Sequence, residues 1–249
     1  FSKKLSTYFC EMKKLAAKVF NKYILVKRKF SKTQYLSLGE NCLTDNILSR
    51  HNLKSFSTPY SHGRSNLDYA INLEQDHYQN LLKQDYLHFD FINNERVVRN
   101  NFYNKCDNIY YNLHLNGFEF THHNVIENES QRKSYERKIS RMQSFAKSKK
   151  LKFLYHYRNN ENKNIKLLIE KAEKFLSYYQ EKSIDCELIF FTQEIITTPD
   201  ERSIIKIHDS NNTKGFVLKT LETWAGEDQD VFWAIKDDDL ILKMINEIK

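Results

Sequence analysis

The segment "YLSLGENC", residues 35–42, places a reactive residue type where a protein fold can activate it. A short strand pattern leads into Gly39, and Cys42 comes directly before a helical pattern over residues 43–51. The N-terminus of a helix offers unpaired backbone N–H groups and the positive end of the helix dipole. These groups stabilise a thiolate and can also bind the oxyanion formed when a thiolate attacks a carbonyl. Cys42 is therefore a candidate nucleophile; the alternative is a small apolar residue packed beneath the helix.

A nucleophilic cysteine needs a proton acceptor, and two pairs of residues are candidates for this role. His122 and His123 end a predicted strand over residues 117–121, and only one of them is expected to face the site because neighbours on a strand point to opposite faces. His208 and Asp209 end another predicted strand, where Asp209 could orient a histidine. In each pair, a histidine that only satisfies a loop hydrogen bond is the alternative.

The segment "STPYSHGRSNLDY", residues 57–69, holds many hydrogen-bonding groups around a proline and a glycine. Such a shaped polar loop is typical of ligand contact, although Asn66 could equally be the N-cap of the next helix. With the turn before Cys42, this loop supplies the candidates for substrate binding, which are Gly39, Asn41, Ser57, His62, Arg64 and Asn66.

Apolar strand patterns alternate with amphipathic helical patterns through the body of the chain. This alternation predicts an α/β fold with a mostly parallel sheet and helices on both faces, a three-layer architecture like the Rossmann and SGNH-hydrolase folds. The expected strands are 35–39, 117–121, 152–157, 186–191 and 203–208, and the expected helices are 43–51, 67–84, 134–148, 164–181, 213–224 and 237–248.

The first part of the chain differs from the rest in charge. Residues 1–32 hold ten of the 39 basic residues and one of the 32 acidic residues, which leaves 29 basic and 31 acidic residues for positions 33–249. Residues 3–24 have one apolar stripe at helical spacing, so we expect a basic amphipathic helix and linker over 1–34 and one α/β domain over 35–249. The helix could pack on the domain, contact an upstream domain, or lie on a membrane surface.

The near-neutral body argues against a nucleic-acid-binding face. The four cysteines are widely separated and form no CxxC motif, which suits a reducing cytoplasm better than a disulfide framework or a zinc site. No run of about eighteen apolar residues is present, so we expect a cytoplasmic protein, with peripheral contact to the inner membrane surface through residues 3–24 as a further possibility.

Five motifs in this order resemble a known bacterial family, that of the putative papain-like cysteine peptidases, whose function is uncharacterised. They are "SLGENC", "SFSTPYSHGRSNLDY", "FTHH", "ERKISRM" ahead of "KFLYHYR", and "WAGEDQDVFW", which together cover roughly residues 35–235. The resemblance implies that Cys42 is the nucleophile and that His122 or His123 is the base. The family more often has His-Asp at the histidine motif, whereas this chain has "HHN", so the acid is missing.

The residues and the resemblance together predict cysteine-dependent acyl transfer through a thioester. A nucleophile directly after the first strand is also similar to the SGNH arrangement of esterases and acetyltransferases. The expected activity is that of a hydrolase or an O-acyltransferase, acting on a small molecule or a glycan such as a surface polysaccharide precursor. It requires no cofactor and no metal, with acetyl-CoA as a conceivable acyl donor. The alternative is a non-catalytic domain that binds a nucleotide or sugar phosphate in glycan biosynthesis.

Overall fold

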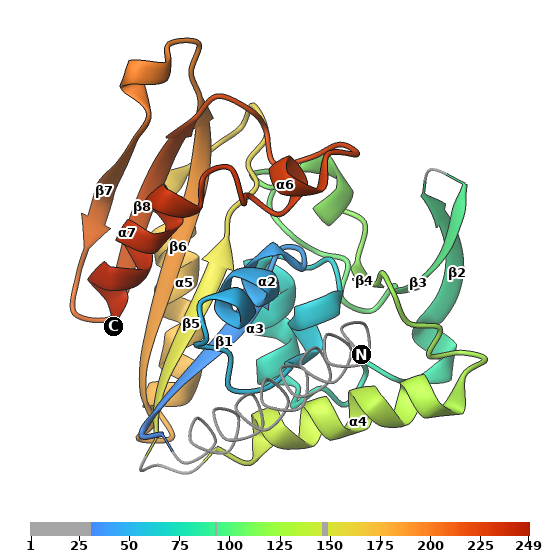
Figure 1. The fold of residues 1–249 in the computed structure, drawn as a ribbon. Coiled ribbons are helices and arrows are strands. Elements are labelled where there is room, and N and C mark those ends of the chain that lie inside the picture. Colours follow the sequence, from blue (N-terminus) through green and yellow to red (C-terminus); the bar gives the residue numbers. More distant parts are fainter. Residues whose placement is uncertain (1–30, 93, 146–148) are drawn as a thin grey trace, which may run out of the picture.

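The structure is a computed structural model that describes residues 31–92, 94–145 and 149–249 (Figure 1). The expected amphipathic helix over residues 3–24 lies outside the described residues. The described part contains a five-stranded sheet, a separate three-stranded sheet, and helices around both. The predicted α/β fold with a mostly parallel sheet is therefore confirmed.

The five-stranded sheet has the order β1-β5-β6-β8-β7, so β1 and β7 are its edge strands. The first four run parallel to one another, and β7 runs antiparallel to β8. We call the edge where the four parallel strands end the carboxyl edge of the sheet. The strands are β1 (Thr33–Gly39), β5 (Lys150–His156), β6 (Asp185–Ile195), β7 (Ser203–Asp209) and β8 (Thr213–Thr220).

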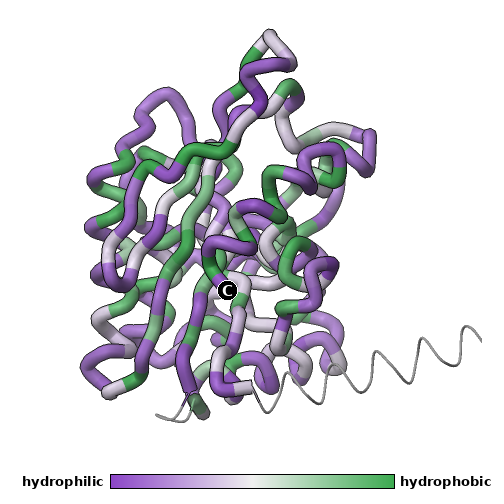
Figure 2. Tube along the Cα trace, turned by 60° about the vertical axis from the view of Figure 1, so that its left-hand side comes forward, coloured by the Kyte–Doolittle hydropathy of each residue, from purple (hydrophilic) through white to green (hydrophobic). Residues whose placement is uncertain are grey.

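Each face of this sheet has its own hydrophobic core. One core joins alternate residues of β1, β5 and β6 to α3 (Leu67–Gln75) and α5 (Ile165–Gln180). The other joins the opposite residues of β5, β6 and β8 to α2 (Leu43–Arg50) and α7 (Asp238–Ile248). Figure 2 shows hydrophobic segments along the inner strands and hydrophilic segments at the periphery. The continuous apolar strands of the sequence are thus explained by burial on both faces.

The three-stranded sheet lies beyond the β1 edge of the main sheet (Figure 1) and has the antiparallel order β2-β3-β4. Its position depends on the loop before α3, because Arg64 pairs with Glu119 of β4 through an isolated bridge. The remaining elements are β2 (Leu87–Ile92), β3 (Glu95–Asn100), β4 (Phe118–Phe120), α4 (Glu129–Gln143), α6 (Gln229–Phe232) and the 3-10 helices η1 (Pro59–His62), η2 (Gln84–Tyr86), η3 (Asn112–His114) and η4 (Pro199–Glu201).

The predicted helix over residues 213–224 is wrong, because residues Thr213–Thr220 form strand β8. A side chain at Gly215 would collide with the ring of Phe190, since a Cβ atom there would lie 2.2 Å from the Cζ atom of the ring. Glycine lets this core ring lie flat across β8, and glycine is unfavourable inside a helix. The predicted helix over 67–84 is also too long, since α3 ends at Gln75 and turns follow it.

Helix α2 is fastened to the C-terminal part of the chain. The Arg50 guanidinium donates to the Trp233 carbonyl at 2.5 Å and to the Asp238 carboxylate at 2.8 Å. The His51 ring lies 2.9 Å from the same carboxylate. Asp238 therefore lies in the first turn of α7, where the helix dipole favours an acidic residue, and it also binds the C-terminal end of α2.

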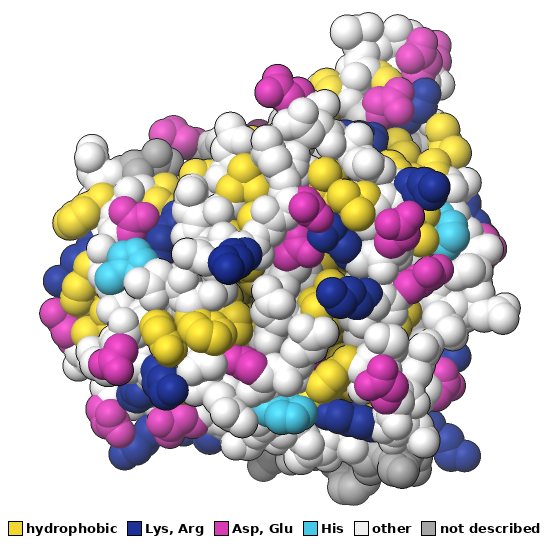
Figure 3. Space-filling view, turned by 180° about the vertical axis from the view of Figure 1, so that it is seen from behind, with side chains coloured by type: hydrophobic (Ala, Val, Ile, Leu, Met, Phe, Trp, Pro, Cys, Tyr) yellow, Lys and Arg dark blue, Asp and Glu magenta, His cyan; other side chains and the backbone are white. Residues whose placement is uncertain are grey.

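The surface carries charges of both signs. On the face shown in Figure 3, basic and acidic side chains alternate and are separated by small hydrophobic groups. Among the described helices, none is long and apolar enough to cross a lipid bilayer.

Candidate active site around Cys42

Cys42 lies at the carboxyl edge of the main sheet, where β1 ends at Gly39 and α2 begins at Leu43. Cys42 is the N-cap residue of α2, and the Asn41 side chain accepts a hydrogen bond from the Leu43 N–H at 3.2 Å. Gly39 has a φ of +125°, and a Cβ there would lie 2.8 Å from the Ser65 hydroxyl oxygen. Gly39 therefore shapes the turn that presents the cysteine.

The thiol of Cys42 is half-buried and protonated at neutral pH. Burial raises its pKa above the ordinary value, and the negative charge of Asp45 adds to this effect. The backbone N–H of Cys42 and the positive charge of Arg64 act in the opposite direction. Since burial dominates, a thiolate forms here only if a nearby group accepts the proton.

Asp45 lies one turn along α2 from Cys42 and is buried. Its Oδ2 atom accepts from the Lys54 ammonium at 2.6 Å, whereas its buried Oδ1 atom has no hydrogen-bond partner among the described residues. The charge of Asp45 raises the pKa of His62 as well as that of Cys42. Thiol, carboxylate and imidazole therefore share one electrostatic neighbourhood at the start of α2.

Two histidines from separate predicted groups come together next to this helix. His62 ends η1, which packs against β1, α2 and α4, and its ring centroid lies 5.8 Å from that of His123. His123 is half-buried against the ring of Tyr135, and burial with the nearby Lys138 ammonium lowers its pKa to about 4. Burial also lowers the pKa of His62. His122 is exposed.

Arg64 is held in place by a buried carboxylate. Its Nη1 atom lies 2.8 Å from Oε1 of Glu119, and its backbone exchanges two 3.0 Å hydrogen bonds with the backbone of Glu119. Arg99 lies 3.0 Å from the other carboxylate oxygen, and the Thr121 hydroxyl donates to Oε1. Glu119 is completely buried, so these two arginines compensate its charge. Arg64 is thus a fixed positive charge that acts on the Cys42 thiol.

Glu40, two residues before Cys42, is a completely buried carboxyl group. The Tyr155 hydroxyl donates to its Oε1, and the backbone N–H of Arg158 donates to its Oε2 at 3.2 Å. The ring of His114 lies 3.7 Å from Oε2. Burial raises the pKa of Glu40 well above its ordinary value and lowers the pKa of His114 well below its own. Both groups are therefore neutral over a common pH range, and their contact is not an ion pair there.

A small amide-rich cavity of 280 Å³ lies where β5 leaves the carboxyl edge. The Arg158 guanidinium lies over the ring of Tyr111 at 4.2 Å, and the Arg158 carbonyl accepts from the Tyr111 N–H at 2.7 Å. The same turn is bonded to Glu40, which joins this cavity to the segment before Cys42. Its lining residues are Asn108, Tyr111, Asn112, Asn159, Asn160, Glu161 and Asn162.

Other predicted site residues have different surroundings. Asn66 is buried and caps α3, with its Oδ1 accepting from Tyr69 N–H at 2.9 Å and its Nδ2 donating to the His114 carbonyl at 2.8 Å. This is the N-cap role that the sequence offered as the alternative. Ser57 is half-buried in the loop before η1.

The prediction that Asp209 orients a histidine beside Cys42 is wrong on geometric grounds. Asp209 pairs with Lys214 at the start of β8, because β7 is antiparallel to its neighbour. Asp209 is therefore at the opposite end of the sheet from the carboxyl edge and at the opposite side edge from β1. It is exposed and bound to the Lys206 ammonium at 3.0 Å.

Sequence reasoning missed Asp45, whose charge acts on the thiol, and also missed the buried contacts of Glu40. Asp45 could have been found from its spacing, because a residue three positions after an N-cap lies in the first turn of the same helix. Arg158 follows a strand that was correctly predicted to be parallel to β1. Its position at the carboxyl edge of the sheet could therefore have been predicted as well. Nothing in the sequence indicates the buried contact of Glu40 with His114, since they are 74 positions apart.

A mostly parallel sheet with a cysteine at the N-terminus of α2, beside the carboxyl edge of the sheet, is a site suited to covalent chemistry. The family model described as "Putative papain-like cysteine peptidase (DUF1796)" matches residues 33–194, and the chain belongs to this family. The match includes the whole neighbourhood of Cys42 described above. No curated protein and no solved structure shows significant similarity to the chain.

Proposed function

We propose that the protein catalyses acyl transfer through a thioester on Cys42. The proposal is carried by one observation: the thiol lies at the N-terminus of α2, where Asp45 acts on both the thiol and the His62 imidazole. Family membership supports a cysteine-dependent enzyme. The position of the cysteine directly after the first strand is analogous to that in SGNH hydrolases, an analogy of arrangement only.

The proposed step begins with neutral His62, which takes the thiol proton as sulfur attacks the acyl carbonyl. The sulfur–carbon bond forms, and the carbonyl electron pair moves to oxygen, where the N–H groups at the start of α2 stabilise it. The bond to the leaving group then breaks, and the leaving group takes the proton from His62. Water or a hydroxyl group then attacks the thioester and gives its own proton to His62. The sulfur–carbon bond breaks, and the departing sulfur takes this proton from His62, which restores the thiol and the neutral imidazole. The free Oδ1 atom of Asp45 is suited to stabilising the imidazolium.

Arg64 is proposed to orient a polar or anionic part of the substrate, because Glu119 fixes its position while its charge acts at the thiol. We propose acetyl-CoA as one acyl donor and a glycan hydroxyl as one acceptor, with hydrolysis as the alternative fate of the thioester. The setting we propose is the cytoplasm.

Acyl transfer is tested by mapping the acylated residue. The protein is exposed briefly to p-nitrophenyl acetate or acetyl-CoA, quenched in acid, and examined by intact-mass and peptide mass spectrometry. We expect one acetyl group on Cys42, with Cys106 unlabelled, since Cys106 is half-buried with a raised pKa and contacts the Tyr69 hydroxyl in a loop instead of lying at a helix N-terminus. Labelling by acetyl-CoA favours transfer, and labelling by the aryl ester alone favours hydrolysis. An unlabelled Cys42 with both donors contradicts the proposal.

The proton acceptor is tested by His62→Gln in the same assay. We expect acylation of Cys42 to slow about 100-fold near pH 7, the usual contribution of a positioned base. In the native protein the rate rises as pH passes the lowered pKa of His62, because only neutral imidazole accepts a proton. In His62→Gln the rate should instead continue to rise with pH into the alkaline range, because it then follows ionisation of the thiol, whose pKa burial raises. His122→Gln, at an exposed histidine, is the matched control and should change little.

A pH profile of His62→Gln identical to that of the native protein excludes His62 as the base. If His123→Gln alone reproduces the loss, the proton acceptor is His123, despite its low pKa.

A non-catalytic binding domain is the second candidate, favoured by the raised pKa of the thiol and by the amide-rich cavity at the end of β5. In that case Cys42 is a packing residue and remains unmodified by both acyl donors and by iodoacetamide at neutral pH.

A further inference from the structure

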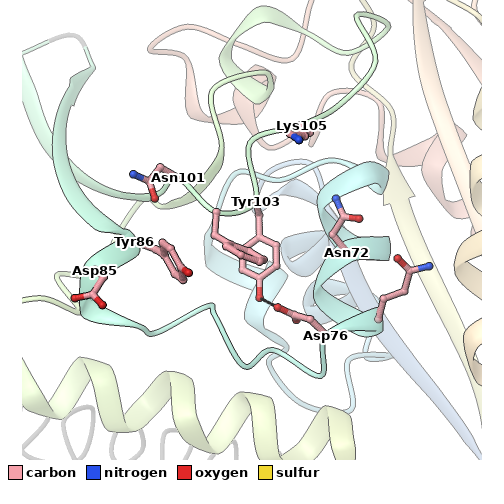
Figure 4. A pocket seen from close by; sticks show the side chains of 9 residues that line it. Asn72, Asp76, Asp85, Tyr86, Asn101, Tyr103 and Lys105 are labelled. Carbon is pink, nitrogen blue, oxygen red and sulfur yellow. Dashed lines mark hydrogen bonds between the residues drawn. The ribbon is translucent and has the colours of Figure 1, made fainter.

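A larger cavity lies away from Cys42, between α3 and the segment that follows β3 (Figure 4). Its volume is 810 Å³, within the range of about 300–1,000 Å³ that is usual for small-molecule sites. Figure 4 shows Asn72 and Asp76 on one side, Tyr86 and Asn101 on the other, and Tyr103 between them. The cavity is lined by Asn72, Gln75, Asp76, Asp85, Tyr86, Asn101, Phe102, Tyr103 and Lys105.

Aromatic rings form a fixed apolar surface in this cavity. The ring centroids of Tyr86 and Phe102 are 4.8 Å apart, and those of Phe102 and Tyr103 are 5.1 Å apart. The Tyr103 hydroxyl donates to the Asp76 carboxylate, which fixes this ring against α3. Phe102 nevertheless remains 44 % exposed. A large ring held in place by its neighbours yet open to solvent is suited to stacking on a ligand.

The polar groups around the rings favour a neutral ligand. The side-chain amides of Asn72, Gln75 and Asn101 can each donate and accept hydrogen bonds. Two carboxylates, Asp76 and Asp85, and the Lys105 ammonium bring both signs of charge to the lining. A cation would meet the Lys105 ammonium of the lining, and an anion would meet its two carboxylates. A purely apolar ligand would leave the amides without partners.

We propose that this cavity binds a neutral saccharide. A sugar ring has one face of C–H groups, which can stack on Phe102 and Tyr86, and hydroxyl groups around its edge, which donate and accept as the three amides do. The proposal is independent of acyl transfer at Cys42, because none of the cavity residues belongs to the active site described above.

The test is saturation-transfer-difference NMR with three neutral probes, cellotetraose, maltotetraose and chitotetraose, and two charged probes, spermidine and oligogalacturonate. We expect saturation transfer to at least one neutral probe, with the dissociation constant raised at least about tenfold in Phe102→Ala and in Asn72→Ala. Phe91→Ala is the matched control, because Phe91 is 68 % exposed on β2 and does not line the cavity. Phe91→Ala and Cys42→Ala should bind like the native protein.

Binding of only a charged probe overturns the proposal, and so does the absence of binding to all three neutral probes at millimolar concentration. Equal weakening by Phe102→Ala and Phe91→Ala also overturns it, since the effect would then be unspecific. Circular dichroism of each variant separates loss of the site from loss of the fold. Because binding is read without turnover, a failure of the acyl-transfer proposal leaves this result unaffected.

Discussion

Cys42→Ala is expected to reduce acyl-enzyme formation by at least about 1,000-fold, to the background of the other cysteines. The reason is that, among the described thiols, only Cys42 lies at a helix N-terminus, where backbone N–H groups can stabilise the oxyanion. Cys186 is buried beneath α5, where its thiol donates to the Leu176 carbonyl at 3.6 Å, and burial with nearby carboxylates raises its pKa to about 12. The measurement is the rate of adduct formation followed by intact-mass spectrometry.

The matched control for this loss is Cys106→Ala. Cys106 resembles Cys42 in being half-buried with a raised pKa, but it contacts the Tyr69 hydroxyl at 3.3 Å in another part of the fold. Cys106→Ala should retain the native rate of acylation. If both variants acylate at the native rate, then neither thiol is the nucleophile, and the adduct must be located on another residue.

The fold should tolerate Cys42→Ala. The thiol is only partly buried, and alanine retains the Cβ atom at the helix N-cap. A change in the free energy of unfolding of about 1 kcal/mol or less is expected. An intact far-UV spectrum together with lost acylation assigns the effect to chemistry rather than to unfolding.

Glu40→Ala is expected to lower the free energy of unfolding by about 3 kcal/mol, which corresponds to a fall in Tm of roughly 6 to 12 °C. The substitution removes the acceptor of the Tyr155 hydroxyl and of the Arg158 N–H, both at the buried carboxyl edge of the sheet. It also leaves a cavity beside the buried His114 ring. Thermal and urea unfolding measure the effect.

Glu40→Gln is the control, because it keeps the side-chain volume and an oxygen acceptor. The sign of its pH dependence follows from the raised pKa of Glu40 in the folded protein. The native protein binds this proton more tightly than the unfolded chain, so the stabilisation is complete below the ordinary pKa of 4.5 and is lost as pH rises toward the folded pKa. Relative to the native protein, Glu40→Gln should therefore gain stability as pH rises above about 4.5. If Glu40→Ala and Glu40→Gln change the free energy of unfolding equally at every pH, the conclusion that the buried Glu40 carboxyl is neutral is wrong.

The elements that place Cys42 could be predicted from the sequence because their signals are local. The strand before Gly39 and the helix after Cys42 both agree with the structure, and so do the strands that became β5 and β6. The apolar runs of these strands are continuous because helices cover both faces of the sheet, so burial of the strands can be recognised from the sequence.

The direction of β7 could not be predicted, and this error moved Asp209 to the wrong end of the sheet. A short apolar strand has the same sequence pattern in either direction. The helical pattern over 213–224 hid β8 as well, so the hairpin of β7 and β8 was replaced by a crossover. Without that hairpin, β7 appeared parallel to its neighbours.

The proposed proton acceptor of Cys42 could not be predicted either, because the contacts that position His62 join segments that are distant in the sequence. His62 was predicted to bind substrate and either His122 or His123 to act as base, and the rings of His62 and His123 lie next to each other. They meet because the Arg64–Glu119 bridge brings the loop before α3 alongside β4. Such a pairing between two irregular segments has no periodic signal.

The attachment of α2 to the C-terminal part of the chain sets a limit on truncation. The family match ends at residue 194, but nine of the fifteen buried residues in the core around α2 come from positions after it. A chain cut after residue 194 would remove the covering layer of Leu43, Ile47 and Leu48, together with the carbonyl and carboxylate that bind Arg50. Domain borders drawn from sequence similarity alone would therefore cut through this shared core, and shortened proteins made on that basis should aggregate instead of retaining a reactive thiol.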